Sequence, residues 1–313
     1  MIEKRFGQAE TPAEKALEAA AAQVPQWRGR SGSYVPVVGG LLNSNWRIAL
    51  DNEPRRFFIK LPGAGSEKFI DRGASHVAAE NAYDMGVGPE PVYFDPASGV
   101  EAFEFLEGYR ACTNADFCEE EIQLSVIELY RTFNAGKPLP LTKTVFDMID
   151  EHFAQAHELG SHLPSDFGWL ERNYEDARAA MMASGLDVVP CFNDPMPGNY
   201  LIKQDAPMKL VDCEFASNNE RAYELGVFLG EMFFPEDRSL ELIEQYYGNA
   251  RPSTVARVNV ARALADIKWA SWAVVNRKLS DWSFDYQKYG VWKYMRARSL
   301  IYDPRWESWL RTV

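Results

Sequence analysis

Two groups of polar residues in the middle of the chain have the types and spacing that phosphoryl transfer requires. The first is the run NDPMPGN at 193–199, and DCE at 212–214 begins thirteen residues after its end. An aspartate on a loop can accept the proton of an attacking hydroxyl, and an asparagine five residues later can bind Mg²⁺. A second aspartate, after a short hairpin, can bridge the metal to nucleotide phosphates. The spacing therefore predicts the active site of a kinase.

The flanking residues favour a functional loop and hairpin over an isolated turn. A run rich in Pro, Gly and Asn is by itself as typical of a surface turn as of a site. Here, apolar runs at 188–191, 200–202 and 208–211 are present, and the last two enclose a turn at 203–207. The second acidic group then stands at the end of an apolar strand, where unpaired carboxylates repel unless a cation lies between them. This context favours metal binding.

Length, charge and cysteine content restrict the class of protein. The chain has 313 residues, 46% of them hydrophobic, which suits a globular enzyme of one large or two ordinary domains. A formal net charge of -12 argues against a nucleic-acid partner, because phosphate backbones bind to basic surfaces. The four cysteines show no CxxC spacing, so we expect free thiols and a cytoplasmic protein. We find no targeting segment and expect no membrane insertion, and the sequence leaves the oligomeric state open.

The first third of the chain has the pattern of a small antiparallel sheet with one inserted helix. A capping box at 11–14 predicts a helix that ends near residue 24. The other expected elements are strands at 34–38, 45–50 and 57–61, a helix at 70–85, and a hairpin with strands at 90–94 and 100–106.

The rest of the chain is helical in composition, apart from the hairpin region at 188–211. Helices are predicted near 116–133, 144–158, 168–184, 220–233, 237–248, 252–279 and 285–302. We therefore predict an α+β, bilobal protein-kinase-like fold, with a small antiparallel-sheet N-lobe at 1–107 and a large, mainly helical C-lobe at 108–313. The N-lobe is expected on the nucleotide phosphate side, and the C-lobe is expected to carry the catalytic loop, metal site and substrate pocket.

Several motifs between residues 38 and 300 resemble those of the choline/ethanolamine kinases, which share the protein-kinase-like fold of the aminoglycoside phosphotransferases. The turn with Gly39, Gly40 and Asn43 resembles the family's phosphate-covering turn, where glycines let backbone N–H groups approach the nucleotide. The run FIKLPG at 58–63 resembles the strand and loop of the bacterial choline kinases. The resemblance implies that Lys60 contacts the α- and β-phosphates of ATP.

The same resemblance assigns roles to the hinge and to the acidic positions. Glu104 and Leu106 lie in the run EFL, which resembles the hinge that supplies backbone hydrogen bonds to adenine. Asp194 matches the catalytic base, which also contacts the substrate hydroxyl. The metal ligands of the family match Asn199, Asp212 and, as an additional acidic residue, Glu214.

A pocket for a choline-like cation is also implied by the resemblance. The matching positions are Phe215, Glu231, Trp269, Trp272 and Tyr289, with Phe215 where the family has a tyrosine. A quaternary ammonium has no N–H to donate, so aromatic faces and a nearby carboxylate would hold it. Two tryptophans at i and i+3 are also typical of a buried helix stripe, and the matches at Glu231 and Tyr289 favour the pocket.

Some positions depart from the family pattern. Phe192 stands where a His commonly braces the catalytic loop, and Glu224 stands where an Asp is usual. Ser75 occupies the place of the helix glutamate that would pair with Lys60. Glu80 is the nearest acid on that helix, about 140° around its axis from Ser75. The sequence therefore leaves open which acid pairs with Lys60.

The resemblance implies an ATP- and Mg²⁺-dependent kinase that phosphorylates the hydroxyl of choline or a related small amino alcohol, a phospholipid precursor. A kinase of another cationic alcohol, such as an aminoglycoside or thiamine, is the nearest alternative. A pseudokinase is a second alternative, favoured by the residues at 75 and 192 and opposed by the presence of the chemically demanding side chains. The sequence leaves the identity of the amino alcohol open.

Overall fold

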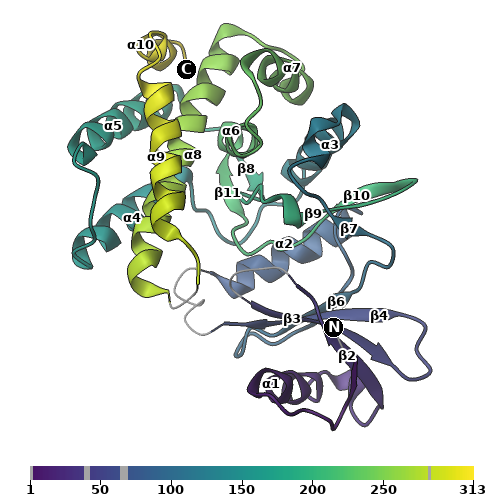
Figure 1. The fold of residues 1–313 in the computed structure, drawn as a ribbon. Helices are drawn as coiled ribbons and strands as arrows, with labels where there is room; N and C mark the ends of the chain where they lie inside the picture. The colour runs from purple at the N-terminus through teal and green to yellow at the C-terminus, as the bar shows by residue number, and fades with distance from the viewer. Residues whose placement is uncertain (1–2, 39–42, 64–69, 281–282) are drawn as a thin grey trace. The chain divides into compact units, whose positions relative to one another are not determined.

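The chain folds into two compact units, each with its own core. The computed structural model describes residues 3–38, 43–63, 70–280 and 283–313. One unit consists of Met1–Cys112 and Pro197–Glu214, and the other of Thr113–Met196 and Phe215–Val313 (Figure 1). The hairpin with the second acidic group therefore belongs to the same unit as the N-terminal sheet. The division of roles between lobes meeting at residue 107 stays a prediction.

An antiparallel sheet with strand order β1-β2-β3-β4-β6-β5 forms the framework of the first unit. Its strands are β1 (Lys4–Arg5), β2 (Gly32–Pro36), β3 (Asn43–Leu50), β4 (Arg56–Pro62), β5 (Pro91–Phe94) and β6 (Glu101–Glu104). Helix α1 (Pro12–Ala21) packs Leu17 with Ile48 and Ile59 of one sheet face. Because side chains alternate along a strand, Lys60 lies on the opposite face, where helix α2 (Arg72–Asp84) is found (Figure 1).

A second, smaller sheet completes this unit and carries the acidic hairpin. It has the order β10-β9-β7, with β7 (Arg110–Ala111), β9 (Tyr200–Lys203) and β10 (Ala206–Leu210). The predicted hairpin is confirmed, with Leu210 opposite Tyr200 in an antiparallel register.

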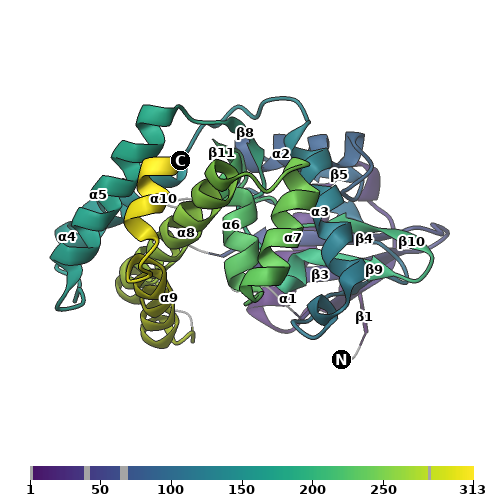
Figure 2. The same ribbon diagram turned by 90° about the horizontal axis from the view of Figure 1, so that it is seen from above.

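The second unit is mainly helical, as predicted. Its helices are α3 (Glu120–Asn134), α4 (Val145–Glu158), α5 (Phe167–Ser184), α6 (Arg221–Glu231), α7 (Glu236–Tyr247), α8 (Pro252–Leu279), α9 (Tyr286–Ile301) and α10 (Trp306–Thr312). Helices α8 and α9 lie side by side in both views (Figures 1 and 2). Gly226 allows α6 to approach α8, because a Cβ atom there would lie 3.1 Å from the backbone carbon of Ala261.

One strand pair in this unit was missed by the sequence patterns. Strand β11 (Ser217–Glu220) pairs antiparallel with β8 (Val188–Cys191) immediately before α6. The predicted helix 220–233 therefore begins one residue too early, since Glu220 ends the strand and caps the helix by accepting the N–H of Ala222 at 3.2 Å.

Across the described parts of the chain, no helix has the length and apolar character needed to cross a membrane.

Candidate active site

Lys60 is the centre of a buried charge cluster in the first unit. Its Nζ lies 3.0 Å from Glu101 Oε2, 2.9 Å from Glu214 Oε1 and 3.4 Å from Asp212 Oδ1. Only 6% of Lys60 is exposed, so the ammonium depends on these carboxylates rather than on water for stabilisation. Asn43 Nδ2 donates to the same Glu214 Oε1 at 2.9 Å. The structure thus brings together four of the predicted residues: Asn43, Lys60, Asp212 and Glu214.

Glu101 is the strand partner of Lys60, and sequence reasoning missed it. The two residues are directly opposite in the antiparallel register of β4 and β6. Such cross-strand neighbours have Cβ atoms about 5 Å apart, which suits an ion pair. Glu80 was the candidate partner of Lys60 on the predicted helix, but its Oε1 instead lies 3.5 Å from His76 Nε2. No local signal marks Glu101, because strand register is set by residues distant in the chain.

The hairpin places the predicted metal ligands Asn199 and Asp212 at the same end of its two strands. Asn199 ends a 3₁₀ turn just before β9, and its carbonyl oxygen accepts the N–H of Val211 at 3.0 Å. Asp212 follows directly, in the left-handed conformation with φ of 69°. Asp and Asn adopt this conformation more readily than other non-glycine residues, and such strained positions concentrate at functional sites.

Burial and the neighbouring charges shift the pKa values of Lys60 and Asp212. Burial opposes the charged form of Lys60, but Glu101, Asp212 and Glu214 raise its pKa well above the ordinary value. Burial, followed by the charge of Glu214, raises the pKa of Asp212 to about 6, while Lys60 lowers it. The Asp212 side chain keeps 34% of its exposure, so solvent moderates this shift. Positive charge near Asp212 and Glu214 is therefore stabilising.

In the second unit, the loop before Asp194 is held by a buried glutamate. Glu224 on α6 accepts the backbone N–H of Phe192 at 2.6 Å and that of Asn193 at 3.1 Å. Asn193 has a left-handed φ of 67°, and its Nδ2 donates to the carbonyl oxygen of Phe215 at 2.8 Å. The adjacent Asp194 is 9% exposed. Glu224 thus fixes the backbone from which the predicted base projects, even though Phe192 cannot act as a bracing His.

The predicted substrate residues of this unit form one aromatic cluster. The ring of Trp269 lies 5.4 Å from that of Phe215 and 5.5 Å from that of Trp272, and Tyr289 lies 6.1 Å from Trp272. Trp269 and Trp272 are 6% and 7% exposed and belong to the hydrophobic core of the unit. Glu231 is paired with Lys293. The two tryptophans thus pack as core residues against other aromatic rings, and their role in a substrate pocket stays a prediction.

The remaining predicted residues concern the nucleotide. Glu104 ends β6 opposite Phe57, and its N–H donates to the carbonyl oxygen of Glu90 at 2.8 Å. Leu106 lies two residues beyond the strand, and its carbonyl oxygen accepts the N–H of Tyr109 at 3.2 Å. Gly39 and Gly40 lie outside the described residues.

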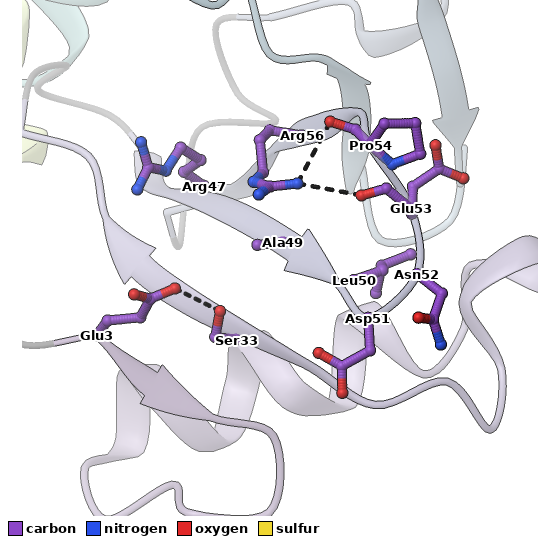
Figure 3. Close-up of a pocket in the computed structure, with 10 residues that line it drawn as sticks. All are labelled: Glu3, Ser33, Arg47, Ala49, Leu50, Asp51, Asn52, Glu53, Pro54 and Arg56. Atoms are coloured by element: carbon purple, nitrogen blue, oxygen red, sulfur yellow. Dashed lines mark hydrogen bonds between the residues drawn. The ribbon is translucent and has the colours of Figure 1, made fainter.

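The first unit also has a surface pocket. It is lined by residues of β2, β3 and the β3–β4 turn together with Glu3 (Figure 3). Arg47 and Arg56 border it, and Arg56 donates to the carbonyl oxygen of Glu53 at 3.1 Å. None of the predicted site residues is among those that line it.

The fold described above agrees with the proteins that this chain resembles. The family model described as choline/ethanolamine kinase matches residues 35–251, so the chain belongs to the choline/ethanolamine kinase family. It is a small-molecule kinase of that family.

Individual relatives cover most of the chain. Protein LicA of Haemophilus influenzae is 21% identical over 257 residues, which cover 80% of this chain and 75% of LicA. The crystal structure of a choline/ethanolamine kinase family protein from Mesorhizobium loti matches with a TM-score of 0.82 and 27% identity, over 96% of this chain and 98% of that one. Choline kinase LicA from Streptococcus pneumoniae matches with a TM-score of 0.77 and 19% identity, over 93% and 99% of the two chains.

Proposed function

We propose that this kinase transfers the γ-phosphoryl group of ATP to the hydroxyl of choline or a related small amino alcohol. Membership of the choline/ethanolamine kinase family supports the substrate class. The observation that carries the proposal is the Glu224 brace, which holds the loop of Asp194 in the second unit through two backbone N–H groups. A base must be fixed in this way, because phosphoryl transfer is catalysed mainly by positioning and electrostatics.

Asp194 orients the substrate hydroxyl and accepts its proton as the oxygen attacks the γ-phosphorus. The bond from that phosphorus to the bridging oxygen breaks, and ADP leaves with the electron pair. Lys60 contacts the nucleotide phosphates. Its ammonium is suited to this role because its pKa is raised well above the ordinary value by Glu101, Asp212 and Glu214, against the effect of burial.

The donor chemistry of three residues fits Mg²⁺. Asn199, Asp212 and Glu214 offer the amide and carboxylate oxygens that this hard cation prefers. Among the described residues, no group of three His, Cys, Asp or Glu side chains has the geometry of a metal site. Mg²⁺ usually keeps several waters and binds through one or two carboxylates together with substrate phosphates, so these residues would hold it as part of such a set. When bound, the metal would neutralise charge on the transferring phosphoryl group. The free thiols of Cys118, Cys191 and Cys213 support our further proposal that the protein acts in the cytoplasm.

The test is phosphorus NMR of ATP, Mg²⁺ and a panel of small alcohols, with the Asp194→Asn variant. We expect a phosphomonoester product from the wild type and a loss of turnover of about 10²-fold to 10⁴-fold in the variant, with ATP affinity retained. Asp205→Asn, in the exposed β9–β10 turn, is the matched control and should keep its rate. An Asp194→Asn variant with the wild-type rate would exclude this base.

A further inference from the structure

Lys268 occupies the aromatic faces that the acceptor substrate was predicted to use. It lies on α8 directly before Trp269, and only 2% of the residue is exposed. Its Nζ lies 3.0 Å from the ring centroid of Trp269 and 5.0 Å from that of Phe215. Within the described part of the chain, this Nζ has no hydrogen-bond partner. A buried nitrogen without a hydrogen-bond partner lowers the stability of the folded protein, and such groups in native structures often have a functional role.

A second lysine takes up the remaining features of the predicted cation pocket. Lys293 Nζ lies 5.0 Å from the ring centroid of Tyr289 and pairs with Glu231. Arg296 Nη2 is also 3.5 Å from Glu231 Oε2. The carboxylate that was expected to balance a substrate cation is therefore already balanced by side chains of the chain itself.

Asp194 connects the aromatic cluster to the reaction. Burial lowers the pKa of Lys268 well below its ordinary value, and the charge of Asp194 is the largest effect that opposes this. Burial, then Glu231 and then Asp194, raise the pKa of Tyr289. The charge of Asp194 therefore acts on Lys268 and on Tyr289, which lie on two sides of the aromatic cluster.

A trimethylammonium group and a group with N–H bonds would meet Lys268 differently. The trimethylammonium group can be held only by aromatic faces and by charge, and Lys268 already covers the faces of Trp269 and Phe215. A primary ammonium is smaller, and it can donate a hydrogen bond to the otherwise unpartnered Lys268 Nζ in its uncharged form, which burial favours. A site built to form a hydrogen bond discriminates strongly against an analogue that cannot form it.

We propose that Lys268 is a specificity-determining residue of the acceptor site, which excludes a trimethylammonium group and selects amino alcohols that retain N–H bonds. This inference rests on the proposed function and narrows its substrate class. Lys268 acts on the non-reacting end of the substrate and takes no part in the transfer step.

The first experiment uses the wild-type protein and calorimetric titration with ethanolamine, its monomethyl and dimethyl derivatives, and choline. We expect affinity to fall with methylation, and to fall by about tenfold or more at the last step, where the final N–H is lost. Equal or tighter binding of choline would overturn the proposal. This comparison needs no variant and no turnover.

The second experiment uses Lys268→Met, which keeps an unbranched apolar side chain and removes the nitrogen. We expect the ratio of choline to ethanolamine affinity to rise by about tenfold or more, because the face of Trp269 is released. Lys288→Met is the matched control, since Lys288 is exposed and its Nζ lies 4.8 Å from the ring centroid of Trp292. An unchanged ratio in Lys268→Met would overturn the proposal. If no alcohol is phosphorylated although ATP binds, the proposed function fails, whereas the binding order of the four amines decides the role of Lys268 separately.

Discussion

Replacing Glu224 by glutamine tests whether this residue supports the loop of the predicted base. Glu224 is fully buried, and its two carboxyl oxygens accept the N–H groups of Phe192 and Asn193. A third donor, Asn134 Nδ2, lies 3.4 Å from Oε2. Glutamine keeps one carbonyl oxygen and places an NH₂ group where the other acceptor was, so one backbone N–H loses its partner. The loss of one buried hydrogen bond should lower the free energy of unfolding by about 1–3 kcal/mol.

The cost of this substitution should depend on pH. Burial raises the pKa of Glu224 from its ordinary 4.5 to about 7, although the hydrogen bonds from Asn193 and Phe192 oppose the shift. Between these values the folded protein holds a proton that the unfolded chain releases, so wild-type stability falls as pH rises. The stabilisation that Glu224 adds to the folded state is complete below pH 4.5 and is lost above about pH 7. The difference amounts to about 3 kcal/mol over this window.

Glutamine does not titrate, so the variant lacks this fall. The penalty of Glu224→Gln should therefore be about 1–3 kcal/mol near pH 5 and should vanish or reverse near pH 8, because the difference between the two pH values is about 3 kcal/mol. Urea unfolding followed by tryptophan fluorescence measures both values, and titrations shared by the two proteins cancel in the difference. Glu244→Gln, on the exposed side of α7, is the control and should show no such dependence.

An equal penalty at both pH values would refute the buried, proton-binding role of Glu224. The same variant has a catalytic readout, since a displacement of the Asp194 loop by about 1 Å can reduce turnover by about 10²-fold. Turnover that stays at the wild-type level would show that the loop does not depend on this brace.

Three further predictions concern charge and packing. Lys60→Met leaves buried carboxylates without their cation, so urea unfolding at neutral pH should show a loss of about 3–5 kcal/mol, whereas an unchanged midpoint would contradict the cluster. Arg257→Met removes the guanidinium that lies 2.8 Å from the fully buried carboxylate of Glu220, so the free energy of unfolding should also fall by about 3–5 kcal/mol. Arg251→Met is the control, because Arg251 is exposed. Gly226→Ala brings a methyl group against Ala261 and should lower the free energy of unfolding by about 1–3 kcal/mol, which thermal unfolding would show as a lower midpoint temperature. A raised midpoint would show that α6 and α8 have room between them.

Local patterns predicted the elements well where neighbouring residues decide them. The capping box at the start of α1 is present, because Thr11 accepts the N–H of Glu14 while the Glu14 carboxylate accepts the N–H of Thr11. The β9–β10 hairpin was also predicted, since a turn between two apolar runs favours it. Strand β11 was missed, because its run SNNE is polar and is fixed by long-range contacts. One such contact is the hydrogen bond from Asn218 Nδ2 to the carbonyl oxygen of Leu139.

The sequence named four members of the Lys60 cluster but did not show how they pair. Lys60 was recognised from the motif around it, yet its partner Glu101 depends on the register between β4 and β6. The neighbours Lys268 and Trp269 are plain in the sequence. The position of Lys268 Nζ over the ring of Trp269 is decided only by the packing around α8.

The sequence alone indicated the family, through the resemblance of its motifs, and the class of fold, through the order of its strands and helices. Motifs and elements of this kind are set by residues close together in the chain, so they can be recognised without the tertiary structure. Tertiary structure alone decided which charges meet, as the contact of Lys60 with Glu214 across 154 residues illustrates. It also decided that Glu231 pairs with Lys293. Such pairings depend on register and on helix packing, which are set by the whole core and not by any local run of residues.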